Sequence, residues 1–207
     1  PYEPIRPFAE KSLMDLTAAF EAAGVTPDNA LRITCLTSSS DGIDYLRERL
    51  FRDYRSAAIA VVQQAREPTR TMVSCEAVAR LGKPPEGGIA YVKPGESGFS
   101  QVALVNTREL VLTGSQLAFG TREEDARLAF QRLGRALEQA GTSYRHIVFA
   151  GAYPLSWPIA GLIAKVRPEF YPSGGAAPPS GTMVAFEGLP SFDAPFALEA
   201  VAAVPDR

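Results

Sequence analysis

An internal repeat is the sequence feature that most constrains the fold of this chain. Residues 20–33, FEAAGVTPDNALRI, and residues 137–150, LEQAGTSYRHIVFA, both place a glycine between the end of a helix pattern and the start of a strand pattern. Later in each half a second helix pattern is followed by Thr-Met-Val, at 71–73 and at 182–184. Because the same elements recur in the same order, the sequence predicts a duplicated domain.

The first half contains four predicted elements. Residues 11–23 carry apolar side chains at helical spacing, and Gly24 follows them as a stop signal, so we expect an amphipathic helix. Residues 30–37, ALRITCLT, are typical of a buried strand. The stretch from Gly42 to about Gln64 predicts one long helix, and residues 71–81 predict a second strand.

A segment rich in glycine and proline, residues 82–98, predicts the boundary between the halves. We therefore expect a truncated or degenerate domain over 1–94 and a complete domain over 95–207. In the second domain, strands at 102–105 and 109–113 predict a hairpin.

The second domain continues with a helix over 124–140 that ends at Gly141. The corresponding helix of the first half is preceded by PYEPIRPFAE, which is too short for a strand hairpin. We expect that the chain begins late or that another segment supplies those strands, because an unpaired sheet edge invites association.

Composition excludes several classes of function. The 46% hydrophobic and 21% charged residues are typical of a soluble globular protein, which we expect to be cytoplasmic. A net charge of −2 and a pI near 5.6 give no basic surface for nucleic acid. No apolar run approaches the roughly 20 residues that cross a bilayer, so we expect no membrane partner. Acidic residues interrupt the arginine cluster, which is typical of a solvated helix face: Arg47, Arg49, Arg52 and Arg55.

Cysteine and histidine are too few for a metal centre. Cys35 and Cys75 are interpreted as small buried hydrophobic residues rather than a disulfide framework. His146 alone has no partners for a histidine-based site. Glycine-rich nucleotide motifs and nucleophile elbows are missing as well. We expect neither a metal nor a cofactor.

The second half resembles the reactive intermediate deaminase family, RidA, also called YjgF or L-PSP. The resemblance rests on six segments in the family's order: GFSQVALV, ELVLTGSQLAF, LEQAGTSYRHI, AYPLS, PPSGTMVAFEGLP and FALEAVAAV. In the first half a partial resemblance runs from the helix at Ala18 to about Leu81.

This resemblance implies an α+β, chorismate-mutase-like fold in which helices cover one face of a mixed sheet. It also implies trimers with ligand pockets between neighbours. Typical members hydrolyse enamines or imines, formed from amino acids, to ketoacids and ammonia without a cofactor. We therefore expect a homo-oligomer with threefold or pseudo-threefold symmetry that binds a small carboxylate-bearing molecule.

The resemblance assigns a water-activating carboxylate to Glu199 in ALEAVAA. From the strand pattern alone, Glu199 is equally a solvent-facing residue of an alternating strand. The family's carboxylate-binding arginine is replaced by Gly181, which cannot form paired hydrogen bonds with a carboxylate. Matching the two halves places Arg70, in PTRTMV, at the position of Gly181.

The register of the strand after Arg70 has two alternatives. If SCEAVARL is laid directly on the family strand, the arginine position moves to Val73 and Cys75 faces the pocket. The two registers differ by three residues, and an odd shift exchanges the faces of a strand. Arg70 is therefore either an anion clamp or an exposed charge at the strand entry.

Other pocket positions depart from the family pattern. Phe99 replaces a tyrosine and removes its hydroxyl group, and the serine and glycine of the family turn appear as Gly114 and Ser115. The remaining substrate-binding candidates are Gln116, Gly181 and Met183. Tyr153 and Trp157 either line a cleft or belong to the core.

These residues support three hypotheses. The first is hydrolysis of an imine or enamine, in which Arg70 binds the substrate carboxylate and Glu199 activates water. The second is a non-catalytic binding or assembly module on the same fold, because the arginine and the tyrosine are lost at Gly181 and Phe99. The third is a diverted activity on another carboxylate, as in the related chorismatases.

Overall fold

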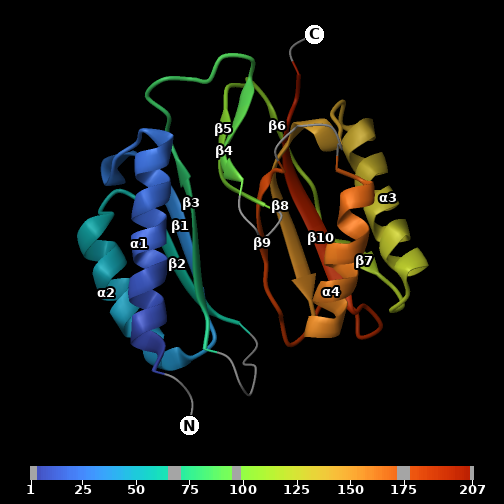
Figure 1. Ribbon diagram of the computed structural model, residues 1–207, viewed down its shortest axis with the longest axis horizontal. Coiled ribbons are helices and arrows are strands. Elements are labelled where there is room, and N and C mark those ends of the chain that lie inside the picture. Colours follow the sequence, from blue (N-terminus) through green and yellow to red (C-terminus); the bar gives the residue numbers. More distant parts are fainter. Residues whose placement is uncertain (1–3, 65–70, 95–98, 172–177, 206–207) are drawn as a thin grey trace. The chain divides into compact units, whose positions relative to one another are not determined.

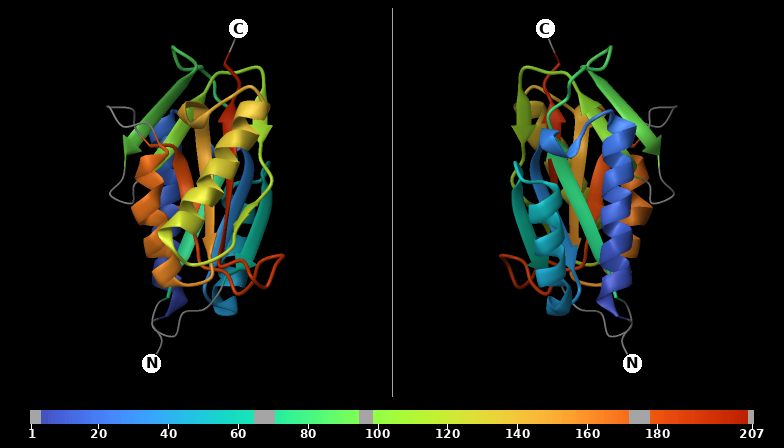
Figure 2. Two further views of the ribbon diagram at one scale, coloured as in Figure 1. Left: turned by 90° about the vertical axis from the view of Figure 1, so that its right-hand side faces the viewer. Right: turned by 90° about the vertical axis from the view of Figure 1, so that its left-hand side faces the viewer.

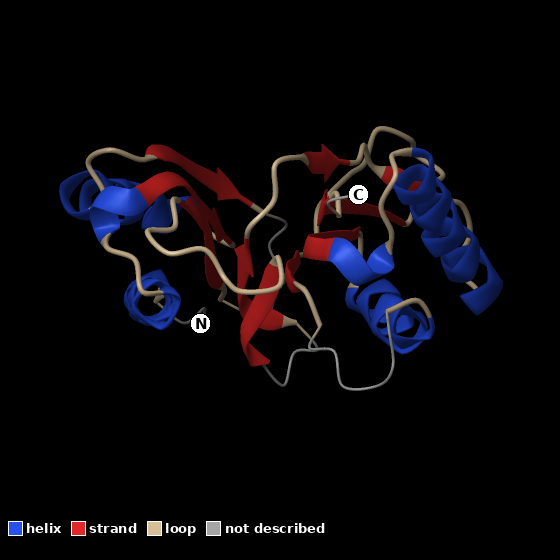
Figure 3. Ribbon diagram, turned by 90° about the horizontal axis from the view of Figure 1, so that it is seen from above, coloured by secondary structure: helices blue, strands red, loops and turns tan. Residues whose placement is uncertain are grey.

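The computed structural model describes residues 4–64, 71–94, 99–171 and 178–205. The chain forms two compact units, 1–83 and 84–207 (Figure 1). In each unit a sheet carries helices on one face, as the colouring by secondary structure shows (Figure 3). The expected α+β class is confirmed.

The first unit consists of two helices and three strands. Its sheet has the order β2-β1-β3, with β2 parallel and β3 antiparallel to the central strand β1. The elements are α1 (Ile5–Ala23), β1 (Ala30–Thr37), α2 (Ile43–Asp53), β2 (Ala58–Gln63) and β3 (Val73–Ala79). Helix α1 ends at Gly24, whose left-handed φ of 67° is a conformation that favours glycine.

The predicted long helix from Gly42 to Gln64 is wrong at its C-terminal end. Helix α2 ends at Asp53, and residues 58–63, AIAVVQ, form β2 beside β1. The β-branched residues Ile59, Val61 and Val62 favour a strand, and pairing with β1 gives their backbone groups hydrogen-bond partners. Tertiary pairing therefore overrides the helical spacing that continues past Tyr54.

The interpretation of the two cysteines as unbonded core residues is also wrong. Cys35 of β1 lies directly opposite Cys75 of β3, and the two form a disulfide across a Cα–Cα distance of 4.1 Å. Cys35 is fully buried among the apolar residues beneath the helices. Sequence spacing could not reveal this pair, because only the antiparallel register brings together residues 40 positions apart.

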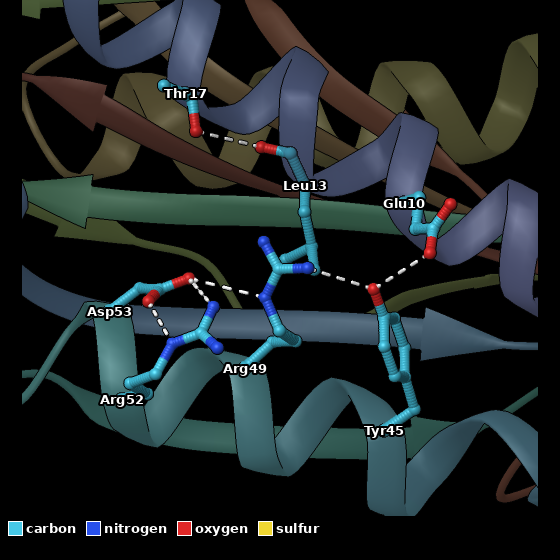
Figure 4. A network of polar contacts seen from close by, with 7 residues as sticks. All are labelled: Glu10, Leu13, Thr17, Tyr45, Arg49, Arg52 and Asp53. Atoms are coloured by element: carbon cyan, nitrogen blue, oxygen red, sulfur yellow. Dashed lines mark hydrogen bonds and ion pairs between the residues drawn. The ribbon is translucent and has the colours of Figure 1, made fainter.

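Polar contacts join the outer surfaces of α1 and α2 (Figure 4). The Tyr45 hydroxyl donates to Glu10 at 3.2 Å and accepts from Arg49 at 2.9 Å. Arg49 and Arg52 also contact Asp53. Three of the four arginines of the predicted cluster, Arg47, Arg49 and Arg52, lie on the outer part of α2, whereas Arg55 lies in the turn after the helix.

The second unit is built on a mixed sheet with the strand order β4-β5-β9-β8-β10-β6, and β7 also pairs with β10. Its strands are β4 (Ile89–Pro94), β5 (Ser100–Val105), β6 (Leu110–Leu112), β7 (Gln116–Ala118), β8 (Ile147–Pro154), β9 (Ser180–Met183) and β10 (Phe196–Ala203). Helices α3 (Glu123–Gln139) and α4 (Trp157–Val166) lie side by side on one face of this sheet (Figure 2, left).

The predicted hairpin between residues 102–105 and 109–113 is wrong. Strand β5 pairs with β4 and β9, whereas β6 and β7 pair with β10. The antiparallel partner of β5 is β4, not the segment 109–113. That segment instead pairs with β10 at the other edge of the sheet. Because β4 pairs in this way, residues 84–94 belong to the second compact unit.

The core of the second unit contains the apolar side chains from one face of α3. In α3 the buried side chains are Ala126, Ala129, Phe130, Leu133 and Leu137, as the spacing predicts. They pack against alternate residues of β10, including Phe196, Leu198 and Ala200. The helix-covered face of the sheet is therefore filled by apolar side chains.

The two units share their connectivity. In each, a central strand follows the first helix, a second helix leads to a parallel neighbour, and the next strand is antiparallel on the other side. Strands β1 and β8 both have a register shift near their start, at Leu31 and at Val148. In this correspondence β3 matches β10. The cross-strand pair Thr34–Glu76 of the first unit then matches the cross-strand pair Gly151–Glu199 of the second.

The expected pairing of the two Thr-Met-Val segments is therefore wrong. Residues 71–73 lead into β3, which is antiparallel to the central strand of its unit. Residues 182–184 include the end of β9, which is parallel to its central strand. The identity of these segments gives no reason to place Arg70 at the position of Gly181.

Candidate functional site

Glu199 lies at the centre of the candidate site, on the face of the second sheet opposite α3 and α4. Its carboxylate accepts a hydrogen bond from the hydroxyl of Tyr153 on β8. Gly151 lies directly opposite Glu199, and a Cβ atom there would lie 2.6 Å from the Tyr153 hydroxyl and 2.8 Å from Cγ of Glu199. The missing side chain of Gly151 therefore makes room for the Tyr153–Glu199 pair.

Tyr153 is held from its other side by Phe186, whose ring meets it edge-on at 5.3 Å between centroids. Both Tyr153 and Glu199 are half-buried. An ordered phenol and a half-buried carboxylate can together position a water molecule for proton transfer. The sequence interpretation that placed Tyr153 in a cleft lining is compatible with this arrangement.

The turn at Gly114 and Ser115 lies beside the backbone of β10 near Glu199. The Thr113 amide donates to the carbonyl of Ala200, and the Ala200 amide donates to the Thr113 hydroxyl. On the other side of the turn, Gln116 pairs with Leu198. Gly114 and Ser115 are exposed, and nothing lies within 4 Å of a Cβ placed on Gly114. Open space therefore surrounds Gly114 beside the backbone of β10.

Phe99, Gly181 and Met183 lie on the helix-covered side of the sheet. Phe99 is 6% exposed, and a Cβ atom on Gly181 would lie 2.5 Å from the Phe99 ring and 2.5 Å from the carbonyl oxygen of Ala150. Met183 packs against the same core. In this arrangement the ring at position 99 fills the space into which a side chain at position 181 would point.

Arg167 is a charged residue that the sequence interpretation missed. It follows α4, in the short helix η4 (Arg167–Glu169), and its guanidinium lies 4.1 Å from the centroid of the Phe99 ring. Burial lowers the pKa of this guanidinium below its usual range. No signal in the sequence marks it, because an arginine at a helix end is ordinarily a solvated C-terminal charge.

A small cavity lies beneath the Phe99 ring. Its lining combines apolar side chains of α3, α4 and the strands with Arg167, Tyr171 and Glu199. Burial raises the pKa of the Tyr171 hydroxyl. The Glu199 carboxylate itself lies on the other face of the sheet, where it contacts Tyr153.

Arg70 and Cys75 are the other two positions that the sequence analysis singled out. Arg70 lies outside the described residues, so its assignment as an anion clamp stays a prediction. Cys75 is joined to Cys35 and lies in the core of the first unit, so the register that gave it a pocket-facing thiol is wrong.

The described residues hold no group of three or more His, Cys, Asp or Glu side chains arranged to bind a metal ion. Within the same ranges, no helix is both long enough and apolar enough to cross a membrane.

The fold and the site together define an α+β domain with a carboxylate on the sheet face opposite its helices. No family model matches this chain, and no curated protein matches it. Among solved structures it is similar to members of the YjgF/Rid family.

Three of these structures illustrate the similarity. The Rid protein YyfB of Yersinia pestis is 20% identical, with a TM-score of 0.47, over 58% of this chain and 96% of its own. The YjgF/YER057c/UK114 member Rv2704 of Mycobacterium tuberculosis is 22% identical, with a TM-score of 0.42, over 56% and 99%. Escherichia coli TdcF, solved with bound serine, is 21% identical, with a TM-score of 0.42, over 48% and 84%.

Proposed function

We propose that this chain hydrolyses imines or enamines derived from amino acids, and that Glu199 activates the attacking water. The observation that carries the proposal is the half-buried Glu199 carboxylate, which the Tyr153 hydroxyl orients. The sequence resemblance to the reactive intermediate deaminases supports the same reaction class. A carboxylate base suits this chemistry, because hydration of an imine carbon requires a positioned water and a single proton acceptor.

In the proposed reaction, water adds to the imine carbon while Glu199 accepts a proton from it. That proton then passes to the substrate nitrogen and gives the carbinolamine. Its hydroxyl proton next moves to the nitrogen, again through Glu199, so that the C–N bond breaks, the carbonyl forms and ammonia leaves. One imine and one water give one ketoacid and one ammonia, so no oxidant, reductant or metal is needed. Tyr153 acts as a positioning residue, because its hydrogen bond fixes one oxygen of the carboxylate.

The reaction also needs a cation for the substrate carboxylate. Arg70 stays the predicted group on the chemistry of its side chain alone, since a guanidinium can form two parallel hydrogen bonds with a carboxylate. Replacing Arg70 with alanine should raise KM for a 2-imino acid at least tenfold if it has this role. An unchanged KM would remove Arg70 from the site.

The activity is tested by generating 2-imino acids with an amino-acid oxidase in the presence of the protein. We expect their decay to accelerate in proportion to the protein concentration, and ammonia to appear at the same rate. Decay at the buffer rate, even at high protein concentration, would contradict the proposal.

A second candidate is a non-catalytic binding or assembly module. The observation that favours it is the Phe99 ring, which occupies the space beside Gly181 where the resemblance expects an arginine side chain. This candidate predicts ligand binding without turnover. It would be refuted if Glu199→Gln and Arg70→Ala each abolished a measured turnover in a folded protein.

We also propose that the two units are copies of one duplicated domain. Their common connectivity and the register shifts at Leu31 and Val148 support this origin. From the resemblance we expect the chain to assemble with threefold or pseudo-threefold symmetry. Light scattering that gives the mass of one chain would contradict the expected assembly.

A further inference from the structure

We propose that the outer edge of β2 is an interface at which two copies of this chain pair, strand β2 against strand β2, across a twofold axis. The pairing joins the three-stranded sheets of the two copies into one continuous sheet. This inference is independent of imine hydrolysis, because it concerns only the first unit and its assembly.

The backbone of β2 provides the first argument. Within the described ranges this six-residue strand pairs with β1 alone. A strand at a sheet edge keeps a row of N–H and C=O groups that point away from its neighbour and can bind another strand. In the second unit the equivalent strand, β9, is paired on its outer side with β5, where Ser100 lies opposite Ser180. The sister unit therefore has a further strand at this position of the fold.

The sequence of β2 provides the second argument. Edge strands that do not associate are usually short, or carry charged residues or proline. Strand β6 has three residues, β4 includes Lys93 and Pro94, and β3 has Glu76 at its middle. Strand β2, with the sequence AIAVVQ, has neither a charge nor a proline. Among the edge strands that the structure describes, β2 alone lacks a feature that prevents pairing.

The same sequence favours a second copy as the partner. In a twofold pairing each residue near the axis meets its own counterpart, so a charged residue there would meet a like charge. Strand β2 brings no charge to the axis, whereas β3 paired with its copy would bring two Glu76 carboxylates together.

Helix α2 provides the third argument. It packs on β2, while α1 packs on β3. Tyr45 faces α1, because its hydroxyl donates to Glu10 (Figure 4), and Leu46 and Leu50 are buried towards the sheet. At 3.6 residues per turn, Phe51 lies on the remaining flank of α2, away from α1 and above the edge of β2. Its side chain is 55% exposed, and a second copy that pairs along β2 covers this flank.

The direction of the axis follows from the two faces of β2. Ile59 and Val61 pack against the core beneath the helices, so Ala60 and Val62 lie on the opposite face. An axis perpendicular to the sheet keeps the helices of both copies on one face, and its centre is then at Ala60 or Val61. In either register the Ala60 residues of the two copies lie directly opposite or diagonal to each other, within about 8 Å.

The test is light scattering on the full chain and on Val62→Lys. The parent should contain an even number of chains, and Val62→Lys half that number, because a lysine on each strand opposes edge pairing. Val78→Lys is the matched control, since Val62 and Val78 are 43% and 57% exposed on opposite edge strands of the same sheet. The control should have the mass of the parent.

A second measurement covers the case in which Val62→Lys fails to fold. Ala60→Cys introduces a single free thiol, because Cys35 and Cys75 are joined to each other. A short bismaleimide, added without a reductant, should link two chains of this variant into a covalent dimer on a denaturing gel. Val78→Cys, treated in the same way, should remain a single chain.

The inference is overturned by any of four results. These are a parent of one or three chains, a Val62→Lys variant with the mass of the parent, an equal loss of mass in Val78→Lys, and no cross-link through Ala60→Cys. A parent of three chains would leave the expected threefold assembly without the β2 pairing. None of these results depends on turnover, so the proposed function is tested separately.

Discussion

Replacing Gly181 with alanine tests whether the Phe99 ring fills the space beside β9. The new methyl group would lie 2.5 Å from the ring and 2.5 Å from the Ala150 carbonyl oxygen, about 1 Å closer than ordinary van der Waals contact. One of these neighbours is backbone and cannot rotate away. Overpacking of this kind costs about 1–3 kcal/mol of unfolding free energy, equivalent to a fall in melting temperature of roughly 4–12 °C.

The assay is urea unfolding of the parent and of a double-mutant cycle with Phe99→Ala. Phe99→Ala alone should cost about 3–5 kcal/mol, because it removes a buried ring. Once the ring is absent, the methyl group of Gly181→Ala fills part of the vacated space. We therefore expect the two substitutions to couple by at least about 1 kcal/mol, so that the double variant is more stable than additivity predicts.

Gly188→Ala is the control for the loss of a glycine. Nothing lies within 4 Å of a Cβ placed on Gly188, so its effect should stay within about 0.5 kcal/mol. If Gly181→Ala were as stable as this control, or if the cycle were additive, the described packing of Phe99 against Gly181 would be refuted.

Three further predictions concern other contacts. Urea unfolding should show that Cys35→Ala destabilises the first unit by about 4 kcal/mol, because the disulfide closes a 40-residue loop and lowers the entropy of the unfolded chain. Alkylation of both cysteines in the parent protein without a reductant would contradict the disulfide. Tyr153→Phe should lower turnover about tenfold while the fold survives, because Glu199 loses its orienting hydrogen bond; unchanged kinetics would remove this positioning role. The hydrogen bonds from Arg127 lower the pKa of Glu169, so this pair should stabilise the protein above the ordinary glutamate pKa and lose its effect as pH falls through the lowered value. Melting curves of Glu169→Gln should therefore match the parent at acid pH and fall below it at neutral pH, and an equal difference at both would contradict the assignment.

Helical periodicity predicted the first helix of the second unit well. The stripe from Ala126 to Leu137 and the stop at Gly141 appear as α3, because burial against a sheet selects that spacing. Strand pairing was harder to predict. Residues 58–63 have both helical spacing and β-branched side chains, and only the neighbouring strand β1 decides between them.

The site could be predicted in part. The resemblance proposes Glu199 as the base, which stays a prediction, and the structure pairs it with Tyr153, a residue whose role the sequence left open. The contact of Arg167 with Phe99 could not be found from sequence, because the two residues lie far apart along the chain. The disulfide was missed for the same reason, since its cysteines meet only through strand register.

The central claim is that Glu199 activates water for imine hydrolysis. The most direct test compares the decay of an oxidase-generated 2-imino acid with parent protein and with Glu199→Gln, which keeps the size of the side chain but removes its basicity. We expect the parent to accelerate decay and the variant to lose at least about a hundredfold in kcat, the usual contribution of a general base. Equal rates for the two folded proteins would contradict the claim.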